Sequence, residues 1–491
     1  MRTGSIVIAV ACSCQTLPAA SSWIELNPDC RTALRERGTG RPFMAVGVNY
    51  FDPHVGWAPK LWQQFDEQKV RRHLRMVSEQ GFNTIRVFLT LQSFHRDPGE
   101  VCPEGEALFR RLLAICRELD LRVIPSGPDH WEGMPSWRVS ADDGRGLPDW
   151  LRTDPFADET VLAADEAWWK AFAGRFAECP TILAWDVLNE PAVPWNSPHM
   201  KPRWNRWLQA EYGSTEAVAR AWGLPADQVG PWGSIEHPPA VAARGDQRLY
   251  DYQRFRTSLG GAWARRMVEA IRQADRGHMV TIGHVQWAVP VYLESVAQYA
   301  GIDARATAGD VDFVSVHFYP LAMPRVCQSP EGTLANRVYL ETLLQYCSTG
   351  KPLMLGEFGW YGGGGIGQAP DWALPPAPME NQVCWGRQLL SVSRGRVCGL
   401  LNWAYADTPA SNDLSRHSGC WTADLELKPW GAEFGAFARS ASRACEPVRP
   451  FDAGREAQRP DLRDLLTDPG VGHAWLRKLI DRLAGASRPA P

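Results

Sequence analysis

The sequence lacks the excess of positive charge that is typical of proteins that bind polyanions. Its 52 Lys and Arg stand against 55 Asp and Glu, and the formal net charge is −3. A chain with this balance creates no long-range field that would concentrate nucleic acid or an anionic membrane at its surface. We therefore expect no nucleic acid among its partners.

Long apolar runs are missing too. None reaches the roughly 18–20 residues that a membrane-spanning helix needs, so we expect no membrane span. Residues 1–22 hold one arginine and an apolar stretch from Ile6 to Val10 before small residues, which fits a weak secretory signal and a secreted or periplasmic protein. Cys12 or Cys14 is alternatively the lipid anchor of a bacterial lipoprotein. An ordinary first strand or a misassigned start explains the segment equally well.

Motifs for metals and redox chemistry are absent. Ten of the twelve cysteines follow residue 20, irregularly spaced and without C-x-x-C, and there is no H-E-x-x-H. We expect no metal and no cofactor, and the sequence pairs no disulfides. Gly362, Gly364 and Gly367 satisfy G-x-G-x-x-G, but the residues after them are too rich in proline to begin the helix of a nucleotide site. We interpret this segment as a loop.

What the sequence does have is eight short apolar runs that alternate with amphipathic stretches. Such runs are typical of parallel strands buried on both faces. Between them, apolar residues recur at helical spacing, as over 108–119 and 255–271. Eight strand–helix units close a (β/α)8 TIM barrel, an α/β fold that we predict for residues 23–430. The runs cover residues 43–50, 82–89, 121–127, 181–190, 278–284, 311–319, 351–359 and 398–406.

Two parts of the chain interrupt this alternation. Residues 192–277, between the fourth and fifth strands, are too long for one loop and one helix, and we predict that they include a helical insertion rich in tryptophan. Residues 431–491 should form a C-terminal extension of short helices that is partly disordered. No repeat of 20–50 residues is present, which excludes solenoids and propellers. We expect a monomer.

Two glutamates end strand-like runs. Glu190 closes "TILAWDVLNE" in the fourth run and Glu357 lies in "KPLMLGEFGW" in the seventh. The carboxyl ends of barrel strands meet at one rim, so these side chains should face each other across its mouth. Cleavage of a glycosidic bond requires such a pair of carboxyl groups. A salt-bridged strand end is the simpler explanation for either glutamate alone, but not for both.

Other strand ends supply polar and aromatic side chains. Arg86 interrupts the second strand, where an unpaired guanidinium would be intolerable, and Glu357 is its natural partner. Tyr319, at the end of the sixth strand, should donate to the same carboxylate. The remaining candidates are His130 after strand three, His317 in strand six and Trp403 at the end of strand eight, and core packing is the competing interpretation for each.

Residues 43–425 resemble glycoside hydrolase family five, the cellulase and β-mannanase family of clan A. The resemblance lies in "NTIRVF", "WDVLNEP", "VHFYP" and "GEFGW", in that order. It implies a (β/α)8 barrel and a retaining hydrolase with Glu190 as acid/base and Glu357 as nucleophile. It further implies that Asn189 holds the sugar 2-hydroxyl, that Arg86 and Tyr319 orient the nucleophile, and that His130, His317 and Trp403 shape the subsite where cleavage occurs.

One segment of the insertion carries a second resemblance. "WLQAEYGSTEAVARAWG" is similar to a stretch of clan A β-galactosidases and related exo-acting enzymes. That similarity implies a lid that restricts the site to chain ends or short oligosaccharides, in place of an open cleft.

The predicted function is a retaining β-glycoside hydrolase that cleaves β-mannan or β-glucan by double displacement. The two carboxyl groups should lie about 5–5.5 Å apart, as retention requires. An exo-acting β-glycosidase or a transglycosylase that acts on short oligosaccharides would share every residue. A non-catalytic carbohydrate-binding barrel would have no need of both glutamates together with Arg86 and Tyr319.

Overall fold

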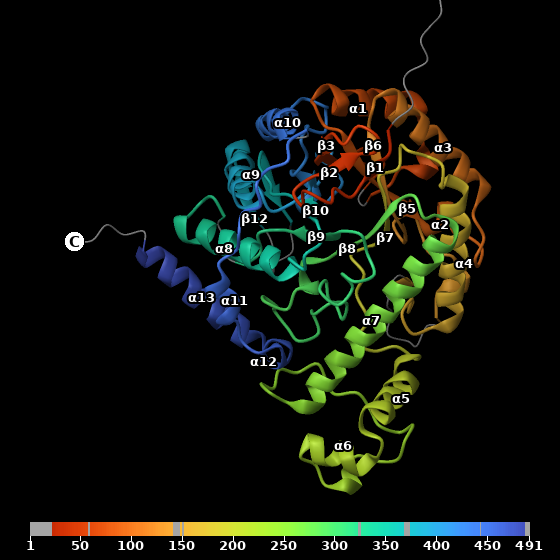
Figure 1. The fold of residues 1–491 in the computed structure, drawn as a ribbon, viewed down its shortest axis with the longest axis vertical. Coiled ribbons are helices and arrows are strands. Elements are labelled where there is room, and N and C mark those ends of the chain that lie inside the picture. Colours follow the sequence, from red (N-terminus) through yellow and green to blue (C-terminus); the bar gives the residue numbers. More distant parts are fainter. Residues whose placement is uncertain are drawn as a thin grey trace, which may run out of the picture.

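Eight parallel strands close into a barrel at the centre of the molecule, in the order β10-β13-β4-β5-β6-β7-β8-β9 (Figure 1). The computed structural model describes residues 22–56, 59–140, 148–149, 152–322, 326–367, 374–441 and 443–486. The predicted (β/α)8 fold is confirmed, and each of the eight apolar runs contains most or all of one strand. The strands are β4 (Ala45–Asn49), β5 (Thr84–Thr90), β6 (Arg122–Asp129), β7 (Ala184–Asn189), β8 (Met279–His284), β9 (Val314–Phe318), β10 (Leu353–Phe358) and β13 (Gly399–Asn402).

Helices cover the outside of the barrel in seven of the eight crossover positions. Aspartate or serine residues begin several of them; Asp158 accepts hydrogen bonds from two backbone N–H groups at the start of α4. The connection from β8 to β9 differs from the predicted alternation, because residues 285–313 contain only the 3-10 turn η5 (Gln286–Ala288). The covering helices are α1 (Glu67–Glu79), α2 (Leu91–Phe94), α3 (Pro103–Glu118), α4 (Glu159–Phe176), α7 (Gln247–Ala274), α8 (Pro330–Cys347), α9 (Met379–Ser393) and α10 (Pro429–Ala441).

The amino-terminal end of the barrel is closed by a small antiparallel sheet of β1 (Ile24–Glu25), β2 (Leu34–Glu36) and β3 (Pro42–Phe43). Ile24, Leu34 and Phe43 pack there against apolar side chains at the beginnings of the barrel strands. This plug makes one end of the barrel a packed core. We therefore expect the active site at the opposite rim, where the strands end.

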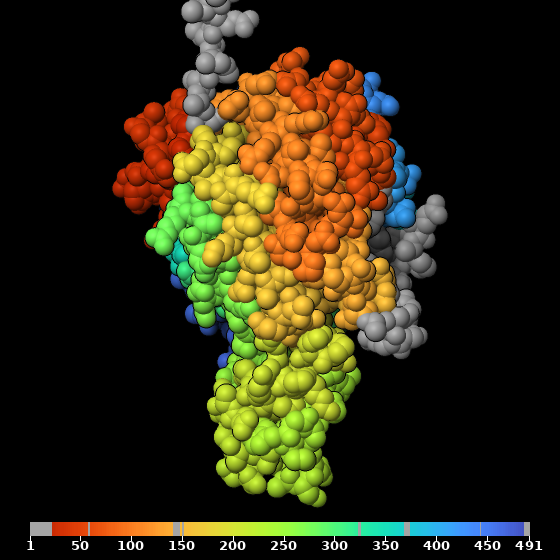
Figure 2. All heavy atoms as spheres, turned by 90° about the vertical axis from the view of Figure 1, so that its right-hand side faces the viewer, coloured from red at the N-terminus to blue at the C-terminus, as the bar shows by residue number. Residues whose placement is uncertain are grey.

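The insertion after β7 forms a lobe that projects from the barrel (Figures 1 and 2). It comprises α5 (Met200–Tyr212), α6 (Thr215–Trp222) and the turn η4 (Ala226–Gln228), and the long helix α7 returns the chain to the barrel. Trp204 stacks between Trp207 and Trp222 and packs on Tyr252 and Phe255 of α7. Much of the tryptophan that the sequence analysis noted in this segment therefore forms a local core.

Helices continue after the barrel. α10 packs beside α9 and the end of α1, and it crosses residue 430, where the sequence analysis ended the catalytic domain. α11 (Ala453–Ala457) and α12 (Leu462–Thr467) are short, whereas α13 (Pro469–Ala486) has 18 residues and lies against α8. None of the described helices is long and apolar enough to cross a membrane.

Two disulfides join distant parts of the chain. Cys30, in the N-terminal plug, is bonded to Cys445 after α10, and Cys327 before α8 is bonded to Cys384 of α9. The predicted signal segment lies outside the described residues apart from Ser22. The glycine-rich loop around Gly364 is partly a hairpin, with β11 (Gly364–Ile366) paired to β12 (Leu374–Ala377).

Candidate active site

Glu190 leaves the barrel at the first residue after β7, in a backbone conformation that turns it out of the strand. Its φ is +48°, in the left-handed region that costs a non-glycine residue about 1–2 kcal/mol. Its backbone N–H still donates to the carbonyl of Gly283 on β8, at 2.8 Å. A carboxylate can follow the apolar run because the chain bends at Glu190 and turns this residue out of the strand. Backbone strain of this kind is typical of functional positions.

Glu357 lies within β10 and is almost fully buried, with 4% of its side chain exposed. Its Oε1 accepts a hydrogen bond from Arg86 Nη1 at 2.6 Å. Its Oε2 accepts one from the hydroxyl of Tyr319 at 2.8 Å. Hydrogen bonds from these two donors favour the ionised carboxylate and fix its orientation.

Arg86 is the centre of a buried network at the barrel mouth. All five of its N–H donors have acceptors, two of which are the carboxylates of Glu357 and Asp186. The other three acceptors are the side-chain oxygens of Asn49 at 3.0 Å, Ser126 at 3.1 Å and Asn189 at 2.9 Å. Because Asn189 accepts through its oxygen, its amide N–H groups remain able to donate to a sugar hydroxyl.

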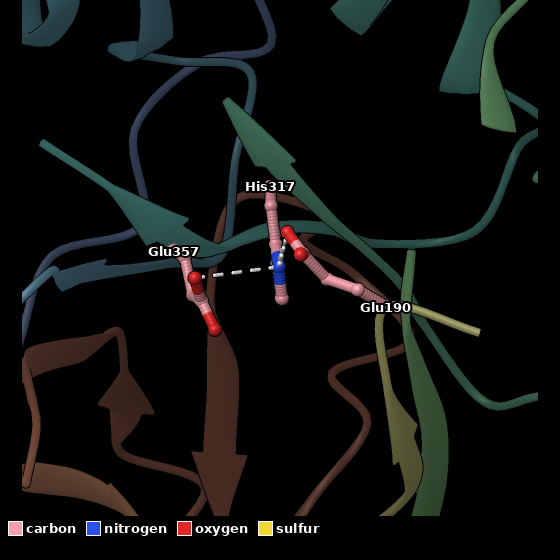
Figure 3. Close-up of side chains that lie close together, drawn as sticks. All are labelled: Glu190, His317 and Glu357. Atoms are coloured by element: carbon pink, nitrogen blue, oxygen red, sulfur yellow. Dashed lines mark hydrogen bonds and ion pairs between the residues drawn. The ribbon is translucent and has the colours of Figure 1, made fainter. Parts of the chain in front are cut away.

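His317 lies between the two glutamates (Figure 3). Its Nδ1 is 2.8 Å from Glu190 Oε1 and 3.6 Å from Glu357 Oε2. Its Nε2 has no hydrogen-bond partner among the described residues, so the tautomer with the proton on Nδ1 fits these surroundings. Burial lowers the pKa of His317 to about 4, which makes the ring neutral at physiological pH.

Two glycines give this imidazole its space. A Cβ added at Gly283 would lie 2.7 Å from Arg86 Nη2 and 3.1 Å from His317 Nε2, and one at Gly356 would lie 2.4 Å from Ser315 Oγ. Any side chain at these positions would displace the groups that contact the carboxylates.

The two glutamates differ in their surroundings although both pKa values are raised. Burial raises the pKa of Glu190 to about 7, with Arg86 opposing the rise and Asp129 adding to it. Burial also raises the pKa of Glu357, while His317 and Arg86 oppose that rise and the charge of Glu190 adds to it. Arg86 touches Glu357 directly, whereas Glu190 is hydrogen-bonded by His317, a neutral histidine. A proton shared by the pair therefore resides on Glu190.

The carboxyl groups lie close together. Ligand atoms of Glu190, His317 and Glu357 are all within 4.8 Å of one another. This spacing would also allow the three side chains to approach a cation. However, these atoms already contact one another, and Arg86 supplies the positive charge at Glu357.

Part of the sequence matches a glycoside hydrolase family. Residues 156–359, which include both glutamates, match the sequence model of glycoside hydrolase family 42, described as β-galactosidase. Over 158 residues the chain is 29% identical to a β-galactosidase of Thermus thermophilus, covering 32% of this chain and 21% of that protein. Over 190 residues it is 27% identical to mannan endo-1,4-beta-mannosidase 7 of Oryza sativa subsp. japonica, covering 33% of this chain and 46% of that protein.

Solved structures from two families share the fold. A β-galactosidase from Rahnella sp. R3 aligns with a TM-score of 0.64 at 17% identity, over 83% of this chain and 57% of that one. A family 5, subfamily 18 protein from Streptomyces cattleya, in complex with GlcNAc, aligns with a TM-score of 0.60 at 18% identity, over 91% and 92%. The chain spans only about a fifth of the length of the Thermus β-galactosidase.

Residues 156–359 of the barrel are similar to a glycoside hydrolase. This match supports the predicted glycoside hydrolase, and the solved structures show the shared TIM-barrel fold. The family model that matches is that of family 42, so the assignment to family five stays a prediction.

Of the other predicted site residues, the structure brings Asn189, Arg86, His317 and Tyr319 to the two glutamates, as described. Trp403, after β13, donates from its indole N–H to Ser415 Oγ at 2.9 Å and packs on Phe51 and Phe88, with one part exposed. Its indole is therefore fixed in orientation. His130 lines the same cavity as Glu190: its Nδ1 is 2.6 Å from Asp129 Oδ1, and its ring packs on Trp131.

Sequence reasoning missed Asn49, Ser126 and Asp186 in this candidate site. Asn49 ends β4, and Asp186 is an acidic residue inside the buried run "AWDVLN". Asp186 was the detectable one, because an aspartate inside a buried strand needs a cationic partner, and Arg86 is a cation in the middle of another buried run. Ser126 carries no such signal.

A cavity of about 470 Å³ opens beside Glu190. It is formed by the loops after β6 and β7, the beginning of the insertion, part of α7 and the segment 297–299. Residues of α5 and α6 do not line it, which differs from the lid that the insertion motif implied. Among its lining residues are His130, Trp131, Asn189, Glu190, Trp195 and Arg256.

Proposed function

We propose that this protein is a retaining β-glycosidase, with a β-galactoside as its first-choice substrate. The observation that carries the proposal is the pair Glu190 and Glu357, close together and in unlike surroundings. Inverting enzymes need about 6.5–9.5 Å between the carboxyl groups, to hold a water molecule between them and the sugar. An oxygen of Glu190 lies within 4.8 Å of an oxygen of Glu357, and this close approach favours direct attack by one carboxylate.

In the first step, Glu357 attacks the anomeric carbon while the bond to the leaving oxygen breaks. That oxygen takes the electron pair of the bond and the proton of Glu190, and a glycosyl ester of Glu357 remains. Tyr319 and Arg86 hold the attacking carboxylate in place. His317 donates from Nδ1 to Glu190 Oε1, which leaves Oε2 to carry the proton.

In the second step, Glu190 is ionised and takes a proton from water as the water oxygen attacks the same carbon. The ester bond breaks, its electrons return to Glu357, and the sugar leaves with its original configuration. Glu190 is suited to both roles because a pKa of about 7 lies near the working pH, where donation and acceptance are both accessible.

The galactoside is favoured by the family 42 match, which spans both glutamates. A second candidate is a β-mannoside, favoured by the match to the rice mannan endo-1,4-beta-mannosidase. The predicted β-glucan remains a third possibility on the same site. Two disulfides among the described residues favour an oxidising compartment, in agreement with the proposal of a secreted or periplasmic protein.

The test compares 4-nitrophenyl β-D-galactoside, β-D-mannoside and β-D-glucoside, with Glu357→Gln as the blank. Proton NMR of the first product identifies its anomer. We expect hydrolysis of the galactoside with the β-anomer formed first. Initial formation of the α-anomer would contradict retention, and equal rates for the wild type and Glu357→Gln would contradict the site. A product larger than the starting glycoside would identify transglycosylation, and binding without turnover would favour a carbohydrate-binding barrel.

A further inference from the structure

The cavity beside Glu190 contains a buried cation that has no carboxylate partner among the described residues. Arg256, on α7, is 1% exposed and lines this cavity. Its Nη1 donates to Gln253 Oε1 at 2.8 Å, and its Nη2 donates to the carbonyl of Val193 at 2.5 Å. Nε has no acceptor within the described part of the chain. These two bonds use two of its five N–H donors.

Arg256 contrasts with the other buried arginines of this rim. Arg86 has acceptors for all five donors and two carboxylates. Arg138, which lines the same cavity, is paired bidentately with Asp165 at 2.5 and 2.8 Å. A buried guanidinium without an anion is costly, and one that is paired and fully hydrogen-bonded is not.

The charge of Arg256 persists under working conditions. Burial lowers its pKa to about 10, and the nearby groups that act on it are the hydroxyls of Tyr252 and Tyr299, which are neutral at physiological pH. Arg256 therefore places a positive charge without a carboxylate partner on one wall of the cavity, whose lining also includes the acidic residues Asp129 and Glu190. An oxyanion on a ligand is the group that would compensate it.

The position of Arg256 points to the leaving-group side of the site. Its guanidinium donates to the carbonyl of Val193, which lies three residues after Glu190. Even along an extended chain, the Cα atoms of Glu190 and Val193 are at most about 10 Å apart. Glu190 would protonate the oxygen of the departing sugar, so that sugar would lie in this cavity. Trp195, whose ring lies 5.2 Å from the guanidinium carbon, offers an apolar face beside the charge.

We propose that the site selects a leaving sugar that carries an anionic group, a carboxylate or a sulfate ester, and that Arg256 is the counter-charge. This inference rests on the proposed glycosidase function for its kinetic test, but anion binding can be tested without turnover.

The kinetic test uses matched disaccharides that differ only in the leaving sugar. We compare β-galactosyl-(1→4)-glucose with β-galactosyl-(1→4)-glucuronic acid. The third substrate is β-galactosyl-(1→4)-glucose with a sulfate ester at the 6-position of its glucose. If the mannoside or glucoside is the better glycone, that sugar replaces galactose. The wild type should have a kcat/KM about 10- to 100-fold higher for at least one acidic substrate, the factor expected from one charge-assisted hydrogen bond. The preferred acid then distinguishes carboxylate from sulfate.

Arg256→Met should remove this preference, so that the variant has the same kcat/KM for the acidic and the neutral disaccharides. Arg265→Met, on the same helix with 62% of the side chain exposed, is the matched control and should keep the preference. If Arg256→Met does not fold, Arg256→Lys replaces it and should lose part of the preference, because the ammonium lacks the planar fork. Equal kcat/KM for neutral and acidic substrates in the wild type would overturn the proposal.

A thermal-shift experiment separates failure of this proposal from failure of the proposed function. If no disaccharide is hydrolysed, D-glucuronate and glucose 6-sulfate are titrated against the wild type and Arg256→Lys, with glucose at equal ionic strength as reference. A rise in Tm with an acidic sugar that is smaller in Arg256→Lys would support the anion site and reject only the hydrolase. Identical Tm values with acidic and neutral sugars would reject the anion site itself.

Discussion

The two glutamates of the candidate active site lie in opposite surroundings. On the side of β10, Glu357 is enclosed, bonded by Arg86 and Tyr319, and almost without exposed surface. On the side of β7, Glu190 has one bond to His317, a third of its side chain exposed, and an open cavity beside it. Charge and hydrogen bonds on one side favour a carboxylate, and their scarcity on the other favours a carboxylic acid. The division of roles is thus a property of the neighbours.

The largest effect on activity should come from replacing Glu357, the enclosed glutamate. Glu357→Gln eliminates the proposed nucleophile, and we expect kcat to fall by at least about 10⁴-fold. Glu357→Ala with added azide should recover part of the activity and yield a glycosyl azide of inverted configuration. Azide that rescues Glu190→Ala in that way, and not Glu357→Ala, would exchange the two roles.

Replacing Glu190, the glutamate beside the open cavity, should lower activity less. The size of this loss should depend on the substrate. Glu190→Ala should lower kcat/KM about 10²- to 10⁴-fold for a disaccharide, the usual contribution of a general acid. A 4-nitrophenyl glycoside needs little protonation and should retain far more of its rate in the glycosylation step. Equal losses on both substrates would argue against the acid role.

The pH profile sharpens the contrast further. Glu190 must be protonated for the first step, so kcat/KM for disaccharides should fall as pH rises through about 7. Glu190→Ala should lack this alkaline limb. If the limb persists in the variant, another group is responsible for it.

Arg86→Met tests how much of the fold depends on the charged network. The substitution leaves Asp186 and Glu357 buried without their cation, and breaking a buried pair in this way costs about 3–5 kcal/mol. We expect a clear drop in the midpoint of urea unfolding. Arg71→Met, which removes a surface pair with Glu118, is the matched control and should change stability by at most about 1 kcal/mol.

The smallest effect should come from Tyr319→Phe. This variant removes one hydrogen bond to Glu357 and leaves Arg86 in place, so we expect kcat to fall about tenfold. Since that bond lowers the pKa of Glu357, its loss should raise the pKa and move the acidic limb of the pH profile to higher pH. An acidic limb that stays in place would mean that Tyr319 does not control the ionisation of Glu357.

The sequence was sufficient for the barrel because a strand buried on both faces has to be a short apolar run, and eight such runs are visible. It was sufficient for Glu190, Glu357 and Arg86 because charge inside such a run has few explanations. It did not reveal the missing helix between β8 and β9, since a loop of about 29 residues and a helical crossover have similar length. Neither Arg256 nor the place of α5 and α6 was accessible, because both depend on how the insertion packs in three dimensions.

The bond between Cys30 and Cys445 has a consequence for the chain as a whole. It joins a segment before the first barrel strand to one after the last covering helix, so the backbone between them becomes a covalent ring of 416 residues including both cysteines, as their sequence separation of 415 requires. A protease that cuts this ring once, for instance near Gly213 between α5 and α6, opens it without releasing a fragment. On a denaturing gel such a nicked molecule would run as one species until a reductant separates it into two.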